Sequence, residues 1–518
     1  MKHKLGLWSL VATGLGSIIG SGWLFSAYKA AKFAGSGAFL AWGISALIII
    51  LLALTIAEIA TLFPLRGLFT RVLAISHNKD MGYITAIANW LGILAVIPTE
   101  AMATIQYLAG INETINHALF LNNTMTTLGS VVVTGLVLLY SLLNFWGTKV
   151  LAHSNNIITV FKFWVPVITA LAIIITSFHP GNFVAEHHKL LPYGMSSVFS
   201  AIMSSGIIYA FNGFQTIANF AAEVHDPAKT IPRALIIAIL LGLFVYLLLQ
   251  TAFIGGLPPK LLEGGWSALS FQSPIVQLTS LLGLNLISLV LYADACVSPS
   301  GTGIVYTGAT VRMLTAMSQE KQAPSFFNHL HPKYNFSRRS LIFNTAFCLC
   351  LLWFFPSWDA LVVIVSLFHI ISYMASPIAL MRLRLTIPHE TRHYKLPFAA
   401  VLCPILFVFI TLLFCLTPQK DLVLVTMVSI AFYLMYIFVS NRGKISPMWY
   451  AFKRSYSLML YFVVLTALGF LGNPKSGGFD LISHTTFYIL MTVISLIFYF
   501  WLVYAPISED VEAREPTF

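Results

Sequence analysis

The sequence predicts an all-α polytopic membrane protein. Hydrophobic residues make up 58% of the 518 residues. Charged residues make up only 9%, whereas a soluble protein carries roughly 25%. So few polar side chains cannot cover a water-soluble globule of this length. The mean hydropathy of +0.84 agrees with this class, and the apolar residues gather in runs long enough to span a bilayer.

Fourteen such runs can be traced along the chain, since a membrane-spanning helix needs about 20 mainly apolar residues. We expect helices over residues 5–27, 38–63, 82–109, 126–146, 151–177, 195–222, 232–254, 283–315, 340–355, 358–382, 399–416, 421–440, 455–472 and 483–505.

The distribution of Lys and Arg supports this topology. An even number of spans places both termini on the same side of the membrane. If that side is the cytoplasm, 22 of the 29 basic residues fall in cytoplasmic segments and 6 in outer segments, with Lys162 inside a helix. Cytoplasmic loops of membrane proteins carry such an excess. The net charge of +11 therefore needs no nucleic-acid partner to explain it.

The first and sixth runs contain residues that weaken helices. Residues 14–25 read GLGSIIGSGWLF, with four glycines among nine residues, and each interior glycine costs about 1 kcal/mol relative to alanine. Glycines four residues apart also serve close helix packing. Asn212-Gly213 interrupts the sixth run. If runs 1–5 and 6–10 are two halves, the interruptions correspond, which indicates a transporter binding site.

The two interruptions suit a particular ligand chemistry. Broken helices are tolerated at membrane depth where their backbone lines a cavity or is buried in protein. Unwinding near residues 16–22 would create a half-helix N-terminus, whose free N–H groups favour a carboxylate. Unwinding near residues 209–213 would free carbonyl oxygens, which favour an ammonium group. Together they suit a zwitterion such as an α-amino acid.

Several segments resemble the amino acid–polyamine–organocation (APC) permeases over roughly residues 5–440. They are GSIIGSG (16–22), AEIATLFP (57–64), FNGFQTIANFAAEVHDPAKTIPRA (211–234) and SPSGTG (298–303). The resemblance implies a LeuT-like fold of two inverted five-helix repeats with four additional C-terminal helices. The implied divisions are a first repeat at 1–180, a second repeat at 181–385, accessory helices at 386–506 and a short acidic cytoplasmic tail at 507–518.

A narrower resemblance points to one bacterial subgroup. Fourteen spans, with PTEAMATIQY (98–107) and DACVSPSGTG (294–303), are similar to permeases that include aspartate–proton symporters. The implied function is proton-coupled amino acid symport by alternating access across the cell (inner or plasma) membrane. An amino acid or amine exchanger and a non-transporting nutrient receptor remain alternatives. The substrate's identity and the oligomeric state stay open.

No enzymatic function is expected. An intramembrane hydrolase would show paired catalytic groups such as H-E-x-x-H or G-x-S-x-G, and neither motif occurs in the chain. We therefore expect no cofactor and no metal. The expected partners are an amino acid, protons and the lipid bilayer.

The resemblance assigns substrate binding to residues at the two interruptions. Residues 20–22 match the positions that hold the substrate carboxylate. The positions that offer carbonyls to the amine or an aromatic gate are matched by Ile208, Tyr209 and Phe211. Gln215 stands where arginine-exchanging relatives carry Glu, so a dibasic substrate or polyamine is less expected. Gly14 and Gly16 are expected to permit bending and close packing. The predicted substrate set is Ser17, Ile18, Gly20, Ser21, Gly22, Ile208, Tyr209, Phe211, Gly213 and Gln215.

Two ionisable residues inside the predicted spans are candidates for proton coupling, because charges within a bilayer are costly and functional by default. Some APC relatives have a lysine at the position of Lys162 in place of a sodium ion. We expect it to brace the first helix when charged, with Ser298, Ser300 and Thr302 as partners. The alternative is a permanently charged structural lysine. Glu100 would relay a proton or contact substrate, or else be satisfied by a neighbouring helix.

Four further residues are expected in gating or structural roles. Asp294 lies one helical turn before Ser298 and shares its face. His369 could transfer protons, although a neutral core histidine is the main expectation. Glu58 and Glu223 lie near the cytoplasmic ends of runs 2 and 6, where we expect them to pair with Arg or Lys.

Overall fold

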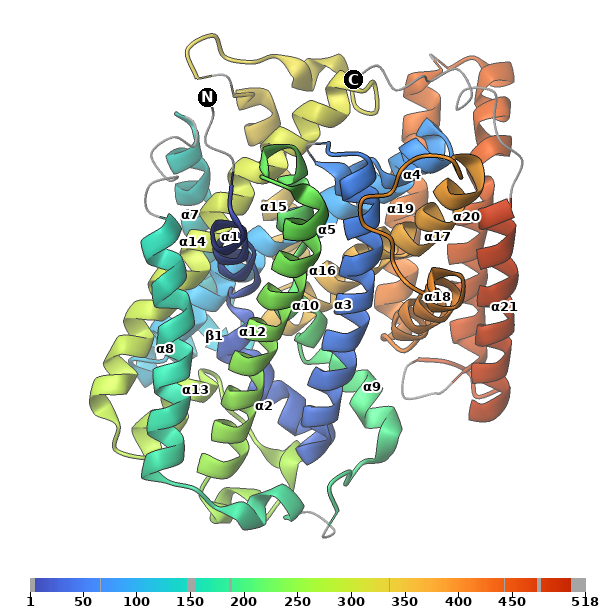
Figure 1. Cartoon of the computed structure of the whole chain (residues 1–518). Coiled ribbons are helices and arrows are strands. Elements are labelled where there is room, and N and C mark those ends of the chain that lie inside the picture. Colours follow the sequence, from blue (N-terminus) through green and yellow to red (C-terminus); the bar gives the residue numbers. More distant parts are fainter. Residues whose placement is uncertain are drawn as a thin grey trace.

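The computed structural model describes residues 5–65, 67–146, 155–185, 189–334, 336–441, 443–472 and 477–504, which are almost entirely helical (Figure 1). The first helices are α1 (Leu7–Ile18), α2 (Gly22–Ala34), α3 (Ala38–Leu62), α4 (Val72–Ser76), α5 (Lys79–Ala109), α6 (Glu113–Leu119), α7 (Thr127–Asn144), α8 (Asn155–Thr176), α9 (Gly194–Ser204), α10 (Ile207–Phe211), α11 (Gln215–Asn219) and α12 (Pro227–Gly256). They are followed by α13 (Pro274–Leu281), α14 (Asn285–Gln319), α15 (Arg338–Phe354), α16 (Trp358–Tyr373), α17 (Ala375–Thr386), α18 (Ala399–Cys415), α19 (Gln419–Ser440), α20 (Ile445–Leu471) and α21 (His484–Tyr504). The strands β1 (Phe120–Leu121) and β2 (Thr124–Met125) pair antiparallel.

The predicted membrane class agrees with the helices. Within the described ranges, nine helices are long and apolar enough to cross a membrane, or up to ten if the bent pair Gly194–Ser204 and Ile207–Asn219 is one span. Two other apolar helices, α1 and α18, are shorter. The count of fourteen spans, the repeat boundaries and the side of the termini stay predictions. The expected tail at 507–518 lies outside the described residues.

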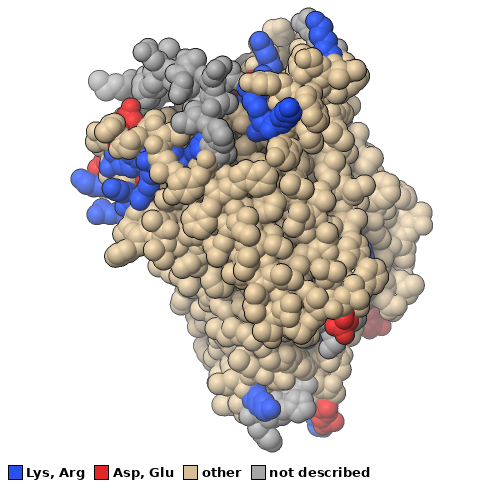
Figure 2. All heavy atoms as spheres, turned by 90° about the vertical axis from the view of Figure 1, so that its right-hand side faces the viewer, with Lys and Arg blue, Asp and Glu red and all other residues tan. Residues whose placement is uncertain are grey.

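Charged side chains gather at the ends of the molecule. Figure 2 shows Lys and Arg concentrated at one end, a middle band almost free of charge, and a few charges at the other end. An uncharged band between charged ends is the surface that a bilayer-spanning protein requires.

The broken ends of helices α1, α2 and α10 lie in the interior of the helix bundle, close to the buried helices α5 and α16. Helix α5 packs against α14 and α16 in the centre, and α1 packs against α8 and α12. Nearly all residues of α5 and α16 and most residues of α17 are buried. Helices α18 to α21 contact one another on one flank, at the right in Figure 1. The breaks between α1 and α2 and around α10 therefore lie inside protein, as broken backbone at membrane depth must.

A buried carboxylate ties α3 to α17 and the segment after it. Arg384 donates from Nε and Nη2 to the two Glu58 oxygens at 2.9 and 2.6 Å, and the Leu396 N–H donates at 2.7 Å. Arg392 Nε lies 3.3 Å from Glu58 Oε1. The Glu58 side chain is completely buried. This is the pairing with arginine expected from the sequence, while a part in gating stays a prediction.

We expect Glu58→Ala to lower the free energy of unfolding by about 3–5 kcal/mol, because it leaves two largely buried guanidinium groups without their carboxylate. The midpoint of thermal unfolding in detergent measures the loss. As a control, Glu320→Ala removes a pair with Arg71 in which both side chains are at least one-third exposed, and it should cost at most about 1 kcal/mol. Equal losses in the two variants would contradict the prediction.

Candidate functional site

The first predicted break is present between α1 and α2. Helix α1 ends just before Ile19, whose backbone is extended, and α2 begins at Gly22. The unwound stretch therefore covers residues 19–21, which is shorter than the predicted 16–22. The first N–H groups of a helix have no partner within it, so the N-terminus of α2 presents donors in the middle of the molecule.

Gly14 and Gly16 remain helical and lie at helix contacts. A Cβ on Gly14 would collide with Ile217 of α11, and a Cβ on Gly16 would collide with Thr159 of α8. These two glycines permit the close packing that the sequence analysis expects of them.

The sixth run is broken twice. Asn212 is extended and Gly213 has φ of +109°, which separates α10 from α11 at the predicted place. A second break that the sequence analysis missed lies at residues 205–206, where Gly206 has φ of +83°. The axes on either side of this second break differ by 51°. Both glycines adopt backbone angles that a side chain disfavours.

Gln215 stabilises the break rather than lining a pocket. Its Oε1 accepts from Gly213 N–H at 3.0 Å and its Nε2 donates to Asn212 Oδ1 at 2.7 Å. Both polar atoms of the side chain are thus bound to the unwound segment itself. The expectation that Gln215 contacts a substrate is not supported by this arrangement.

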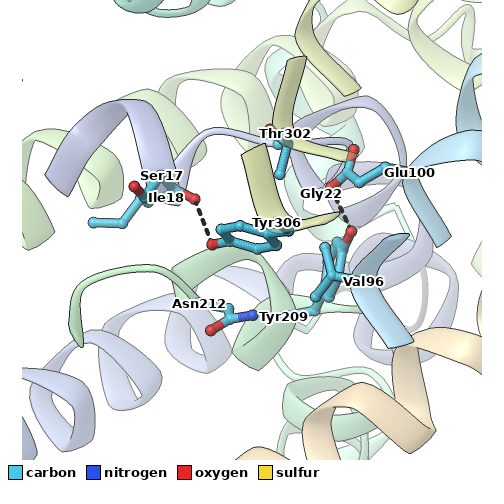
Figure 3. A pocket seen from close by; sticks show the side chains of 10 residues that line it. Ser17, Ile18, Gly22, Val96, Glu100, Tyr209, Asn212, Thr302 and Tyr306 are labelled. Carbon is cyan, nitrogen blue, oxygen red and sulfur yellow. Dashed lines mark hydrogen bonds between the residues drawn. The ribbon is translucent and has the colours of Figure 1, made fainter. Parts of the chain in front are cut away.

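A small cavity lies between the two broken segments (Figure 3). As the side chains lie, the free space is only about 10 Å³, which is room for about one water molecule, so an amino acid fits only after the lining moves. The lining residues come from the first break, α5, the α10 break and α14. They are Ser17, Ile18, Gly20, Gly22, Val96, Glu100, Tyr209, Asn212, Thr302 and Tyr306.

The predicted substrate set overlaps this lining in part. Ser17, Ile18, Gly20, Gly22 and Tyr209 line the cavity, whereas Ser21, Ile208, Phe211, Gly213 and Gln215 do not. The Phe211 ring instead packs edge-on against Trp42 and Tyr246. The lining residues outside the predicted set, apart from Glu100, are Val96, Asn212, Thr302 and Tyr306. Tyr306 follows Thr302 by four residues, a spacing that places both on one helix face and could have revealed it.

Glu100 reaches from α5 into the first break. Its two carboxylate oxygens accept from the Ser21 N–H at 3.1 and 3.0 Å, and Tyr209 Oη donates to Oε1 at 2.5 Å (Figure 3 draws the Tyr209 bond). A Cβ on Gly20 would lie only 2.6 Å from Oε1, so glycine permits this approach. The side chain is buried. Its carboxylate lies at the α2 N-terminus, where the sequence analysis expects a substrate carboxylate.

Lys162 binds the α1 end of the same break. Its Nζ donates to Thr302 Oγ1 at 2.7 Å and to the Gly16 carbonyl at 3.3 Å. It thereby links α8, α14 and the last turn of α1, which is the bracing expected of it. The other expected partners are engaged elsewhere: Ser298 donates to Asp294 at 2.7 Å, and Ser300 accepts from the Tyr140 hydroxyl at 2.9 Å.

Asp294 and His369 are buried and partly without hydrogen-bond partners. Asp294 Oδ1 accepts from Ser298, and Oδ2 has no partner. His369 Nδ1 lies 2.7 Å from the Val365 carbonyl, which makes it the protonated nitrogen, and Nε2 has no partner. A neutral histidine packed in the core fits this geometry. Among the described residues, no three His, Cys, Asp or Glu side chains form a group that could hold a metal ion.

Glu223 contributes its backbone to a contact with the chain before α1. Its carbonyl accepts from the Leu5 N–H at 2.8 Å, and Leu5 forms a β-bridge with Val224. The chain before α1 is thereby fixed to the end of the sixth run.

Aromatic rings and an ion pair that the sequence analysis missed link α2 to α16 next to Tyr209. Trp358 of α16 stacks on Phe25 at 4.5 Å and packs edge-on against Tyr209. Beyond them, Lys29 Nζ lies 2.7 Å from Asp359 Oδ2. Lys29 is 330 residues from its partner, and no local pattern in the sequence indicates such a pair.

Comparisons with known proteins agree on a class of amino acid transporters. A family model described as amino acid permease matches residues 5–440. The chain is similar to a glutamate/serine transporter of Bacillus subtilis, with 36% identity over 509 residues that cover 97% of this chain and 93% of the relative. It is also similar to an aspartate-proton symporter of the same species, with 29% identity over 513 residues that cover 97% and 96%.

A solved structure shows a similar fold. A manganese transporter variant of Eremococcus coleocola superposes with a TM-score of 0.51, covering 89% of this chain and 96% of that chain. The two sequences are 13% identical, so the likeness concerns the fold alone.

We expect Gly213→Ala to destabilise the protein by about 2 kcal/mol or more. Its Cβ would lie 2.5 Å from the Ser17 carbonyl oxygen, and its φ of +109° strains a residue with a side chain. Gly135→Ala is the control, because a Cβ on Gly135 of α7 meets nothing within 4 Å, and alanine favours a helix interior. Thermal unfolding in detergent should show a loss for the first variant and no loss for the second; a harmless Gly213→Ala would refute the strained break.

Proposed function

The chain belongs to the amino acid permease family, and we propose that it is a proton-coupled amino acid symporter of the cell membrane. In this proposal the substrate binds by alternating access at the unwound segments between α1 and α2 and around α10. The observation that carries the proposal is the N-terminus of α2, which presents its Ser21 N–H to a carboxylate inside the protein. A helix N-terminus is a ready site for an anion.

The geometry fits both ends of an amino acid. The α2 N-terminus would bind the α-carboxylate. On the other side of the cavity, the Ser17 carbonyl accepts a long bond of 3.4 Å from the Tyr306 hydroxyl (Figure 3). A carbonyl oxygen has two lone pairs, so Ser17 retains capacity for an ammonium donor. No covalent chemistry is needed for this function.

We propose a polar or acidic amino acid as the substrate class. Two relatives that nearly span the chain are named for glutamate, serine and aspartate. The polar groups that line the cavity include the Tyr209, Thr302 and Tyr306 hydroxyls and the Asn212 side-chain amide, which suit a polar side chain.

The coupling machinery in this proposal is the pair of Lys162 and Glu100. Both side chains are buried, they interact electrostatically, and each binds one side of the first break. Ionisable groups placed this way inside a membrane protein form proton pathways. A change of protonation at either group would alter the hydrogen bonds that this group makes with the unwound segment between α1 and α2.

The proposal predicts uptake of radiolabelled serine, glutamate or aspartate by purified protein in proteoliposomes. An inward proton gradient should drive accumulation above the external concentration, because each cycle brings a proton inward with the substrate. Collapse of the gradient with a protonophore should abolish accumulation. Transport that needs internal amino acid and ignores the gradient would identify an exchanger instead.

We expect Lys162→Gln to lower gradient-driven accumulation at least about tenfold. Exchange of labelled for unlabelled substrate at equal pH should continue, since the cavity itself is kept. Lys260→Gln, which changes an exposed loop lysine, should match the wild type. Full gradient-driven uptake by Lys162→Gln would remove Lys162 from the coupling machinery.

A further inference from the structure

We propose that the Glu100 carboxylate is an internal stand-in for the substrate carboxylate, so that an amino acid binds only after Glu100 takes up a proton and leaves the N-terminus of α2. This inference rests on the proposed function and deepens it. It assigns the coupled proton to one group and states why the proton and the substrate must bind together.

The first argument is that the carboxylate subsite is already occupied. Both Glu100 oxygens lie within 3.1 Å of the Ser21 nitrogen, and Oε1 lies where a side chain on residue 20 would begin. The Ser21 hydroxyl interacts with Tyr209 at 3.1 Å and accepts from Trp358 Nε1 at 3.3 Å. A substrate carboxylate cannot approach the Ser21 N–H while Glu100 holds it.

The second argument is electrostatic. Two ionised carboxylates that share one donor at a few ångströms repel each other strongly in a site without bulk water. Protonation removes this repulsion. The charged and titratable groups that interact with Glu100 come from five helices, and Lys162 also interacts with Asp294. They are Lys162 (α8), Tyr209 (α10), Tyr246 (α12), Tyr306 (α14) and Tyr140 (α7).

The proton balance is simple. In the empty site, Glu100 is ionised and accepts from Ser21 and Tyr209. A proton from the outer solution binds one Glu100 oxygen, and the substrate carboxylate takes over the Ser21 N–H. When the substrate leaves on the inner side, Glu100 releases that proton to the inner solution and returns to Ser21. One proton therefore accompanies each amino acid, and no other reactant is needed.

This stoichiometry makes the transported charge depend on the substrate. Serine is a zwitterion without net charge, so its transport with one proton carries one positive charge. Glutamate carries one negative charge at neutral pH, so its transport with one proton carries none. An inside-negative membrane potential at equal pH should therefore stimulate serine uptake and leave glutamate uptake unchanged.

The decisive experiment measures the Kd of serine against pH with the purified full chain. For the wild type, the Kd should rise about tenfold for each pH unit over a range above the pH at which Glu100 loses its proton, since binding takes up one proton. In Glu100→Gln the Kd should be independent of pH. The matched control is Asp80→Asn, since Asp80 is a buried carboxylate on the same helix that binds Arg454 and Tyr436; it should keep the wild-type slope.

A second variant tests occupancy directly. Glu100→Ala removes the internal carboxylate, so acetate should enter the vacated subsite and raise the serine Kd competitively. Acetate should have no such effect on the wild type. Size-exclusion profiles and thermal midpoints establish that each variant is folded.

The possible results separate the two proposals. If the wild type binds serine with a Kd that does not change with pH, or if Glu100→Gln keeps the wild-type slope, the stand-in role of Glu100 is wrong while amino acid transport stands. Insensitivity of Glu100→Ala to acetate also overturns it. If the wild type binds no amino acid at any pH, the proposed function fails and this inference fails with it.

Discussion

The site depends on which groups of the chain bind the free backbone N–H and carbonyl groups of a broken helix, since the bilayer supplies no water to bind them. Opening the backbone at residues 19–21 leaves carbonyls at the end of α1 and N–H groups at the start of α2. These ends carry partial charges of opposite sign. Lys162 binds the Gly16 carbonyl on one side, and Glu100 binds the Ser21 N–H on the other. The protein thus places a lysine and a glutamate at the two ends of the break, and in their ionised forms these groups carry the same two charges that an amino acid offers.

The sequence predicts the breaks at residues 19–21 and 212–213 because they require backbone conformations or close contacts that glycine accepts best. Gly213 adopts φ of +109° with the Ser17 carbonyl against it, and Gly20 admits the Glu100 carboxylate at a distance that excludes a side chain. Such positions accept little besides glycine, so they leave a mark in the amino-acid sequence. Lys162 and Glu100 leave a mark as well, since an ionisable side chain in an apolar run is costly and points to a functional role.

The sequence could not predict which way neutral polar side chains turn. Gln215 and Asn212 lie in the same broken segment, yet Gln215 binds the Gly213 N–H and the Asn212 side chain, whereas Asn212 also faces the cavity. Ser298 and Ser300 flank Pro299 but bind Asp294 and Tyr140 rather than Lys162. These choices depend on packing between helices distant in the chain. For the same reason, the contacts of Trp358 and Asp359 with α2 could be found only in the structure.

In the proposed cycle, the arrangement of Glu100 at the Ser21 N–H would also account for tight coupling of a proton and an amino acid at one site. An empty site with ionised Glu100 has its Ser21 N–H satisfied, and so does a site with protonated Glu100 and a bound carboxylate. Two other states of the site, with only the proton bound or only the amino acid bound, are higher in free energy for different reasons. Protonated Glu100 without substrate leaves a buried N–H poorly satisfied, at a cost of about 1–3 kcal/mol. Substrate beside ionised Glu100 places two anions on one donor. Because both of these states are costly, the proposed cycle would carry neither a proton nor an amino acid readily without the other.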